Sequence, residues 1–114
     1  MNEIYENLKA SIAALHLAEL AMIEAKESVD DAIDMREEAR NAIKLHEAAK
    51  KNIYRHDYDA REANRKATEH AAYTYYQYTE WLPYREKELA ECKKKYTAAK
   101  KNHAEAMKAF LHSI

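Results

Sequence analysis

The sequence predicts an all-α fold, a long antiparallel helical hairpin of the coiled-coil type with an alanine-rich seam. The first observation is a column of large apolar residues that recurs every seven positions, interrupted only by Arg36: Leu8, Leu15, Met22, Val29 and Ile43. The second is an alanine column three positions away: Ala18, Ala25, Ala32 and Ala39. Apolar residues at alternating spacings of three and four are typical of a coiled-coil seam. Alanine at every other seam position predicts that a partner helix approaches closely.

The third observation is the composition. The chain has no glycine and one proline among 114 residues, which excludes the tight turns of β-hairpins and the glycine-rich loops that hold phosphates. Alanine, glutamate and lysine dominate, as in long helices. The hydrophobic fraction is 47%, but much of it is alanine and tyrosine. A monomeric core would therefore be thin, and we expect self-association to bury more surface.

The first helix is expected from about residue 2 to about residue 54, with Asn2 as its cap. Ser28 and the acids after it look locally like a helix start, but the two columns run through them, which favours one continuous helix. The N-terminal half carries apolar residues on more than one side, which is typical of a helix with several neighbours. We therefore expect an oligomer interface there, formed by Leu8, Ile12, Leu15, Ala18 and Met22.

The first break in the helical pattern is expected near Asp57. Asp59 and Glu62 have the spacing of a capping box, and Asp57 is an alternative cap. Because glycine is absent, we expect the turn to use His, Asp or Asn in left-handed geometry.

Pro83 divides the second arm into expected helices at about 58–82 and 84–112, with a kink between them. The large and small columns return after the proline, as Leu89, Tyr96, His103 and Phe110 beside Cys92, Ala99 and Ala106. The arms 2–54 and 58–112 are nearly equal in length, so a hairpin with its turn near Asp57 pairs them throughout as a single helical domain, 1–114. The alternative is a reversal at Pro83 that gives a three-helix bundle.

The charge and the cysteine content limit the cellular location and the binding partners that we expect for the protein. The net charge of −1 gives no overall basic excess for nucleic acid or membrane. The single Cys92 fits a reducing compartment, although an intermolecular disulfide stays open. No apolar run approaches the roughly 20 residues of a membrane helix, and the N-terminus lacks the basic region of a secretory signal. We expect a cytoplasmic protein that does not insert into membranes.

The most unusual feature is a cluster of six aromatic residues within twelve positions: Tyr73, Tyr75, Tyr76, Tyr78, Trp81 and Tyr84. Six such residues do not fit on one side of a helix, so some should be exposed unless another chain covers them. Tyrosine combines a large contact area with a hydroxyl and few rotatable bonds, which suits binding surfaces. The cluster predicts a partner-binding surface, with Tyr75, Tyr76 and Trp81 as the expected contributors. The alternative is that half of the rings pack inside and the rest are wetted surface.

A weaker candidate is a lysine stripe for anions, in which Lys87, Lys94, Lys101 and Lys108 recur every seven residues. Such a stripe could follow phosphates, but neighbouring glutamates dilute its field. An acidic face on the first helix matches it: Glu24, Glu27, Asp31, Asp34 and Glu38. We therefore favour helix pairing within or between subunits over nucleic acid.

Catalytic and metal-binding patterns are not found in the sequence. No two of the six histidines lie four residues apart, and none follows a glutamate by three, so the motif of di-iron bundles is missing. Cys92 occupies a small-residue position of the second seam, which predicts a structural thiol. We expect no enzyme activity, no cofactor and no metal.

Together these features predict a non-catalytic helical interaction module, an adaptor or inhibitor that engages another protein through the tyrosine-rich helical face. The first alternative is a binder of a small anionic ligand or nucleotide at a subunit interface. The second is a structural or assembly protein that oligomerises through the first helix.

Overall fold

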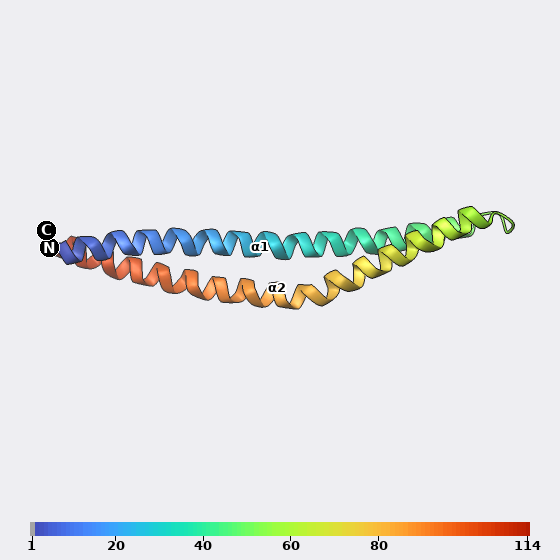
Figure 1. The fold of residues 1–114 in the computed structure, drawn as a ribbon. Coiled ribbons are helices and arrows are strands. Elements are labelled where there is room, and N and C mark those ends of the chain that lie inside the picture. Colours follow the sequence, from blue (N-terminus) through green and yellow to red (C-terminus); the bar gives the residue numbers. More distant parts are fainter. Residues whose placement is uncertain (1) are drawn as a thin grey trace. The chain divides into compact units, whose positions relative to one another are not determined.

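The computed structural model describes residues 2–114 and contains two long helices, α1 (Asn2–Lys50) and α2 (Tyr58–Ser113), which confirms the all-α prediction (Figure 1). No strand occurs in this range. Neither helix is long and apolar enough within residues 2–114 to cross a membrane.

α1 ends at Lys50, before the expected end near Tyr54. The backbone N–H groups of Lys51, Asn52 and Ile53 each donate to the carbonyl three residues earlier, at 3.3, 2.9 and 3.4 Å. Such bonds tighten and terminate the last turn of a helix. No residue in the described range has positive φ, so the expectation of left-handed geometry in the turn was wrong. The tightened last turn ends the helix without it.

Asp57 caps α2. Its Oδ1 accepts a hydrogen bond from the N–H of Ala60 at 3.1 Å, and its carbonyl accepts one from the N–H of Arg61 at 3.1 Å. The side-chain bond satisfies an N–H group that has no partner inside the helix. Of the two caps that the sequence suggested, Asp57 is therefore the one used, and Asp59 lies inside the first turn of α2.

α2 continues through Pro83, so the two helices expected at 58–82 and 84–112 form one. The proline lacks one backbone donor, but Leu82 beside it is buried, with 7% of its surface exposed. Packing of this kind offsets the loss of a single helical hydrogen bond. Because the chain does not reverse at Pro83, the three-helix alternative is not formed.

The helices make two compact units, the first from residues 2–28 with Arg85–Ile114 and the second from Val29–Tyr84. In the first unit the ring centroids of Tyr5 and Phe110 lie 6.4 Å apart, and Ser11 Oγ lies 3.2 Å from His103 Nδ1. At the other end of this unit, Arg85 donates to the carbonyl of Ser28 at 3.0 Å. As the residue numbers increase along α1, those of the facing residues in α2 decrease. The two helix segments of this unit are therefore antiparallel.

The second unit is also an antiparallel pair. Asn64, near the start of α2, donates through Nδ2 to the carbonyl of His46, near the end of α1, at 3.0 Å. Its buried residues are all apolar, and Ala32 has no exposed surface at all. The buried set in this unit is Val29, Ala32, Ala39, Ala71 and Leu82.

The two columns of α1 form the seam. Every residue of α1 that is buried belongs to one of them: Leu8, Ala25, Val29, Ala32 and Ala39. Arg36, the one charged member of the large-residue column, is half-buried. The seven-residue pattern therefore identified the inner face of α1 correctly.

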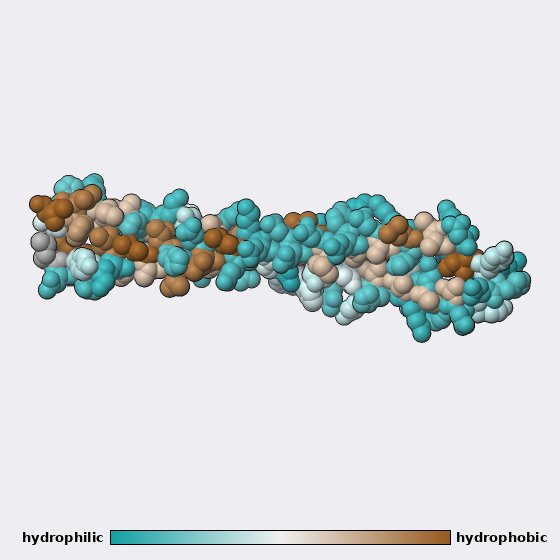
Figure 2. Space-filling model, turned by 90° about the horizontal axis from the view of Figure 1, so that it is seen from above, coloured by the Kyte–Doolittle hydropathy of each residue, from teal (hydrophilic) through white to brown (hydrophobic). Residues whose placement is uncertain are grey.

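Large apolar side chains remain exposed in both units. Figure 2 shows hydrophobic residues gathered over the end that Figure 1 marks with N and C, which belongs to the first unit. The exposed large apolar residues of the first unit include Ile12, Leu17, Leu20, Ile23, Leu111 and Ile114. A thin alanine seam encloses few large side chains, so the others lie on the outer faces.

We expect Ala32→Leu to lower the free energy of unfolding by about 1–3 kcal/mol, because a larger side chain overpacks the closed seam. Ala21→Leu is the matched control, since Ala21 is exposed on the same helix and should tolerate leucine. Urea denaturation followed by circular dichroism measures both. Equal stability of the two variants would show that the alanine column does not set the helix spacing.

Candidate functional site

The aromatic cluster lies on α2 in the second unit, and the helix divides it between two faces. Tyr73, Tyr76 and Tyr84 are exposed, with 63%, 66% and 75% of their surfaces accessible, and Trp81 is 40% accessible. Tyr75 and Tyr78 are half-buried. We call Tyr73, Tyr76 and Tyr84, with Trp81 at their edge, the outer tyrosine face.

Helix geometry explains this division. At about 100° per residue, the three exposed tyrosines fall within about 80° of one another. The two buried residues of α2, Ala71 and Leu82, point to the opposite side.

The inner face of α2 also shifts within the cluster. Its buried and half-buried positions include Ala67, Ala71 and Tyr75, two successive steps of four residues where a strict seam alternates four with three. An insertion of this kind locally unwinds the seam and changes which residues face it. Tyr75 therefore turns inward and Trp81 outward, so the expectation that Tyr75 is exposed was wrong, whereas Tyr76 and Trp81 are exposed as predicted.

Contacts among the rings hold the outer tyrosine face in place. Tyr76 meets the half-buried Tyr75 edge to face, with centroids 5.9 Å apart, and Trp81 meets the half-buried Tyr78 in the same way at 5.3 Å. Gln77 Nε2 donates to the hydroxyl of Tyr73 at 3.1 Å. Such contacts reduce the conformational entropy that the rings lose when a partner binds.

The charge within this face is negative. Glu80 projects between Tyr76 and Tyr84 at the same helical spacing, is exposed, and forms no ion pair among residues 2–114. No lysine or arginine lies between residues 67 and 84. A platform for nucleic-acid bases normally combines aromatic rings with a basic groove, and this face lacks the basic part.

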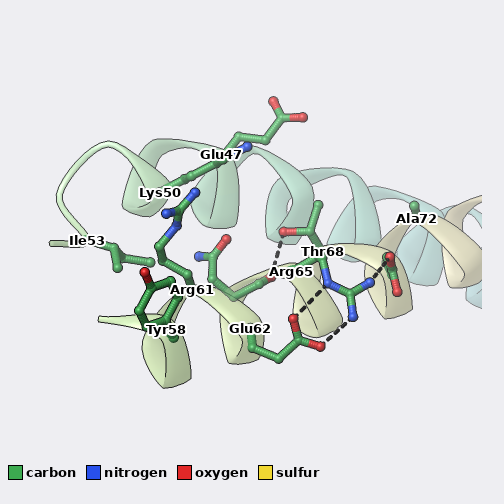
Figure 3. Close-up of a pocket in the computed structure, with 11 residues that line it drawn as sticks. Glu47, Lys50, Ile53, Tyr58, Arg61, Glu62, Arg65, Thr68 and Ala72 are labelled. Atoms are coloured by element: carbon green, nitrogen blue, oxygen red, sulfur yellow. Dashed lines mark hydrogen bonds and ion pairs between the residues drawn. The ribbon is translucent and has the colours of Figure 1, made fainter. Parts of the chain in front are cut away.

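A second candidate is a pocket of about 490 Å³ in the second unit, between the end of α1 and the start of α2. Figure 3 shows Lys50, Ile53, Tyr58 and Arg61 at the end near the turn, with Arg65 farther along α2. This volume is within the range of small-ligand sites. Its lining residues are Glu47, Lys50, Ile53, Tyr58, Arg61, Glu62, Asn64, Arg65, Thr68, Glu69 and Ala72.

The cations of the pocket differ in their availability. Arg65 is engaged by two carboxylates, Glu62 at i−3 and Glu69 at i+4. Its hydrogen bond to Glu62 lowers the pKa of that carboxyl and raises the pKa of Arg65 itself. Arg61 donates to the backbone carbonyl of Arg55 at 3.1 Å, and Lys50 has no ion pair within residues 2–114. Lys50 and Arg61 are therefore the groups left for an anion. The sequence offered no signal for this pocket, because its residues come from both sides of the turn.

The residues predicted for an oligomer interface mostly serve the chain's own seam. Leu8 is buried and Leu15, Ala18 and Met22 are half-buried on the inner face of α1. Only Ile12, at 50% exposure, is available to another chain. The reason is that the other four belong to the seven-residue columns, which pair with α2.

The predicted lysine stripe, Lys87, Lys94, Lys101 and Lys108, is exposed throughout. None of these lysines forms an ion pair in the described part of the chain, and neither does the acidic face of α1. The four ion pairs found within residues 2–114 join residues three or four apart on one helix. The sequence left open whether the two faces pair within the chain or between subunits. Pairing within the chain is not found among the described residues.

The remaining reactive groups are dispersed. Cys92 is a half-buried free thiol, and His103 lies against Ser11 in the first unit. Across residues 2–114, no three His, Cys, Asp or Glu side chains gather closely enough to hold a metal ion.

Comparison with known proteins gives no family. No family model matches the sequence, and neither a curated protein nor a solved structure matches it.

The Arg65 cluster generates a prediction about pH. Arg65→Leu should raise the pKa of Glu62 toward its ordinary value of 4.5, because the largest cause of the lowering, the hydrogen bond from Arg65, is removed. In the wild type, this interaction stabilises the fold fully above the unfolded pKa and is lost as pH falls through the lowered folded pKa. NMR titration of the Glu62 carboxyl carbon measures the change.

Lys66→Leu is the control for this titration. It removes a nearby charge whose effect on Glu62 is smaller than that of Arg65. Equal shifts in the two variants would mean that general charge, and not the hydrogen bond, sets the pKa of Glu62.

Proposed function

We propose that this chain is a non-catalytic protein-binding module, an adaptor or inhibitor, that engages its partner through the outer tyrosine face. The observation that carries the proposal is the exposure of three tyrosines, between 63% and 75%, on one side of a helix whose opposite side is packed. Aromatic side chains grouped in this way are typical of interaction hot spots. Clustered exposed rings also lower solubility, so an interaction is the ordinary explanation for them.

The rings are supported from beneath, which favours binding. Tyr75 and Tyr78 are half-buried and contact Tyr76 and Trp81 edge to face. A partner that docks here meets rings with few remaining conformations, so less entropy is lost in the complex.

The charge of the face favours a partner with arginine or lysine. The carboxylate of Glu80 lies among the tyrosines without an ion pair in the described residues, and tyrosine faces attract cations. A guanidinium stacked on a ring and bonded to Glu80 would satisfy both groups. The free thiol of Cys92 supports a reducing compartment such as the cytoplasm for this encounter.

Site-specific crosslinking tests the proposal and names the partner. A photoreactive phenylalanine placed at Tyr73 or at Tyr84 should capture the same host protein. The same group at Tyr54 should not, although Tyr54 is 85% exposed, because it lies in the turn and outside the outer tyrosine face.

Alanine variants then measure how much each ring contributes to the free energy of partner binding. Tyr76→Ala or Tyr84→Ala should weaken binding of the captured protein by about 2 kcal/mol, roughly thirtyfold, with an unchanged melting temperature. Tyr54→Ala should change neither quantity. Loss of stability without loss of affinity would mean that the rings are structural, and capture of the partner at Tyr54 alone would move the interface to the turn.

A second candidate function is the binding of a small anionic ligand or nucleotide in the pocket of the second unit. The supporting observation is the pairing of two cations, Lys50 and Arg61, with the apolar surface of Ile53 and the ring of Tyr58 around about 490 Å³. Three carboxylates also line the pocket, which restricts the ligands to those whose anionic group reaches the turn end. This candidate uses the pocket within one chain, whereas the sequence suggested a subunit interface.

A thermal-shift titration with ATP, and separately with inorganic phosphate, tests this candidate. A ligand present at 100 times its Kd stabilises the folded state by about 2.7 kcal/mol and so raises the melting temperature. Lys50→Gln and Arg61→Gln should abolish the rise, and Lys94→Gln on the lysine stripe should leave it intact. An equal rise in all the variants would assign the effect to non-specific charge.

The third function class, a structural or assembly protein, requires self-association through α1. Its supporting observation is the exposed apolar surface of the first unit.

A further inference from the structure

α1 carries a second seam in the first unit, separate from the one that packs against α2. Its members follow the same alternation of four and three residues as a coiled coil: Tyr5, Lys9, Ile12, His16, Glu19 and Ile23. All six are exposed, and the three apolar members, Tyr5, Ile12 and Ile23, are 50%, 50% and 43% accessible. An α-helix with two such stripes is built to contact two neighbours. α2 occupies only one of them.

The second seam is complementary to itself when a copy lies antiparallel to it. Pairing about the midpoint of the stripe sets Tyr5 opposite Ile23 of the second copy and Ile12 opposite His16. The same register sets Lys9 opposite Glu19. Twofold symmetry repeats each contact, so the six residues make four largely apolar contacts and two ion pairs.

Charge disfavours one of the two neighbouring registers. A shift by one heptad would place Lys9 opposite Lys26 of the second copy and would repel. Lys9 and Glu19 are both available for these pairs in the single chain. Within residues 2–114, Glu19 forms no ion pair, and the ion pair of Lys9 is with Glu6 at 4.0 Å, where both side chains are more than half exposed. Exposed pairs of that kind contribute little energy and exchange readily.

Tyr5 is already positioned for such a contact. One side of its ring meets Phe110 of α2, with centroids 6.4 Å apart, while half of its surface stays open. Lys9 Nζ lies 5.5 Å from the centre of the same ring. The contacts within the first unit thus orient the apolar end of the second seam outward.

We propose that the protein forms a symmetric antiparallel dimer in which the second seam of α1 packs against the second seam of another copy. The two Lys9–Glu19 pairs fix the register of this dimer, and Tyr5, Ile12 and Ile23 provide its apolar contacts. The interface extends for about 27 Å along α1, at about 1.5 Å per residue. It lies in the first unit and shares no residue with the outer tyrosine face, so each proposal stands or fails alone.

A charge exchange tests the dimer, read by sedimentation velocity of the full chain between 1 and about 300 μM, a range that spans weak to moderate affinities. The wild type should sediment as a dimer in the upper part of this range. Lys9→Glu, which sets two carboxylates against each other, and Glu19→Lys, which sets two ammonium groups, should each raise the dimer dissociation constant about tenfold or more. The double variant Lys9→Glu with Glu19→Lys restores opposite charges and should return close to the wild-type constant.

Two further variants complete the design. Lys94→Glu makes the same charge change on the lysine stripe of α2 and should leave the dimer intact. Ile12→Asp places a charge in the apolar part of the interface and should give a monomer. Circular dichroism checks that each variant keeps its helices, and if Lys9→Glu unfolds the chain, Glu19→Lys and Ile12→Asp decide the outcome.

Three results would overturn the proposal. The first is a wild-type chain that stays monomeric throughout the concentration range. The second is a dimer that is indifferent to the single charge changes. The third is a double variant that dissociates as readily as the single variants.

Discussion

The close contact of alanines with the facing helix is the constraint on which the rest of the structure depends. Ala25, Ala32 and Ala39 are all buried, and Ala32 has no exposed surface. Small side chains let two helix backbones approach, and backbones that approach closely leave little space for large residues between them. Accordingly, no large side chain in the described residues is fully buried. In each unit the seam is thin where a globular core would be thick.

A thin seam explains why the two proposed interaction surfaces lie on outer faces. A helix has more circumference than one partner helix covers, so apolar residues outside the seam stay in contact with water. In the second unit these are the exposed tyrosines and Trp81, and in the first they include Ile12 and Ile23. Both surfaces repeat at helical spacing, which is how one helix presents a continuous surface to another protein. The molecule is therefore organised to offer helix faces, and a pocket lined by Lys50 and Arg61 lies beside the turn.

The ion pairs among residues 2–114 act locally in the fold. The ion pairs join neighbours on one helix, as in the Glu62, Arg65 and Glu69 cluster, and Asp57 caps the start of α2. The acidic face of α1 and the lysine stripe of α2 remain exposed. Their charges do not hold the helices together, which leaves that role to apolar burial and to a few polar contacts such as that of Ser11 with His103.

The sequence by itself determined the helical class, the inner face of α1 and the position of the turn, because a seven-residue pattern and the lack of glycine are local properties of the chain. It also located the aromatic cluster, since its density is visible without a structure. Only the tertiary structure decided which rings are exposed, because two successive four-residue steps at Ala67, Ala71 and Tyr75 shift the face that packs. The same holds for Leu8 and Leu15, whose pairing with α2 depends on the antiparallel register. The pocket at Lys50 and Arg61 was beyond sequence reasoning, because residues from two helices meet there only once the chain has turned.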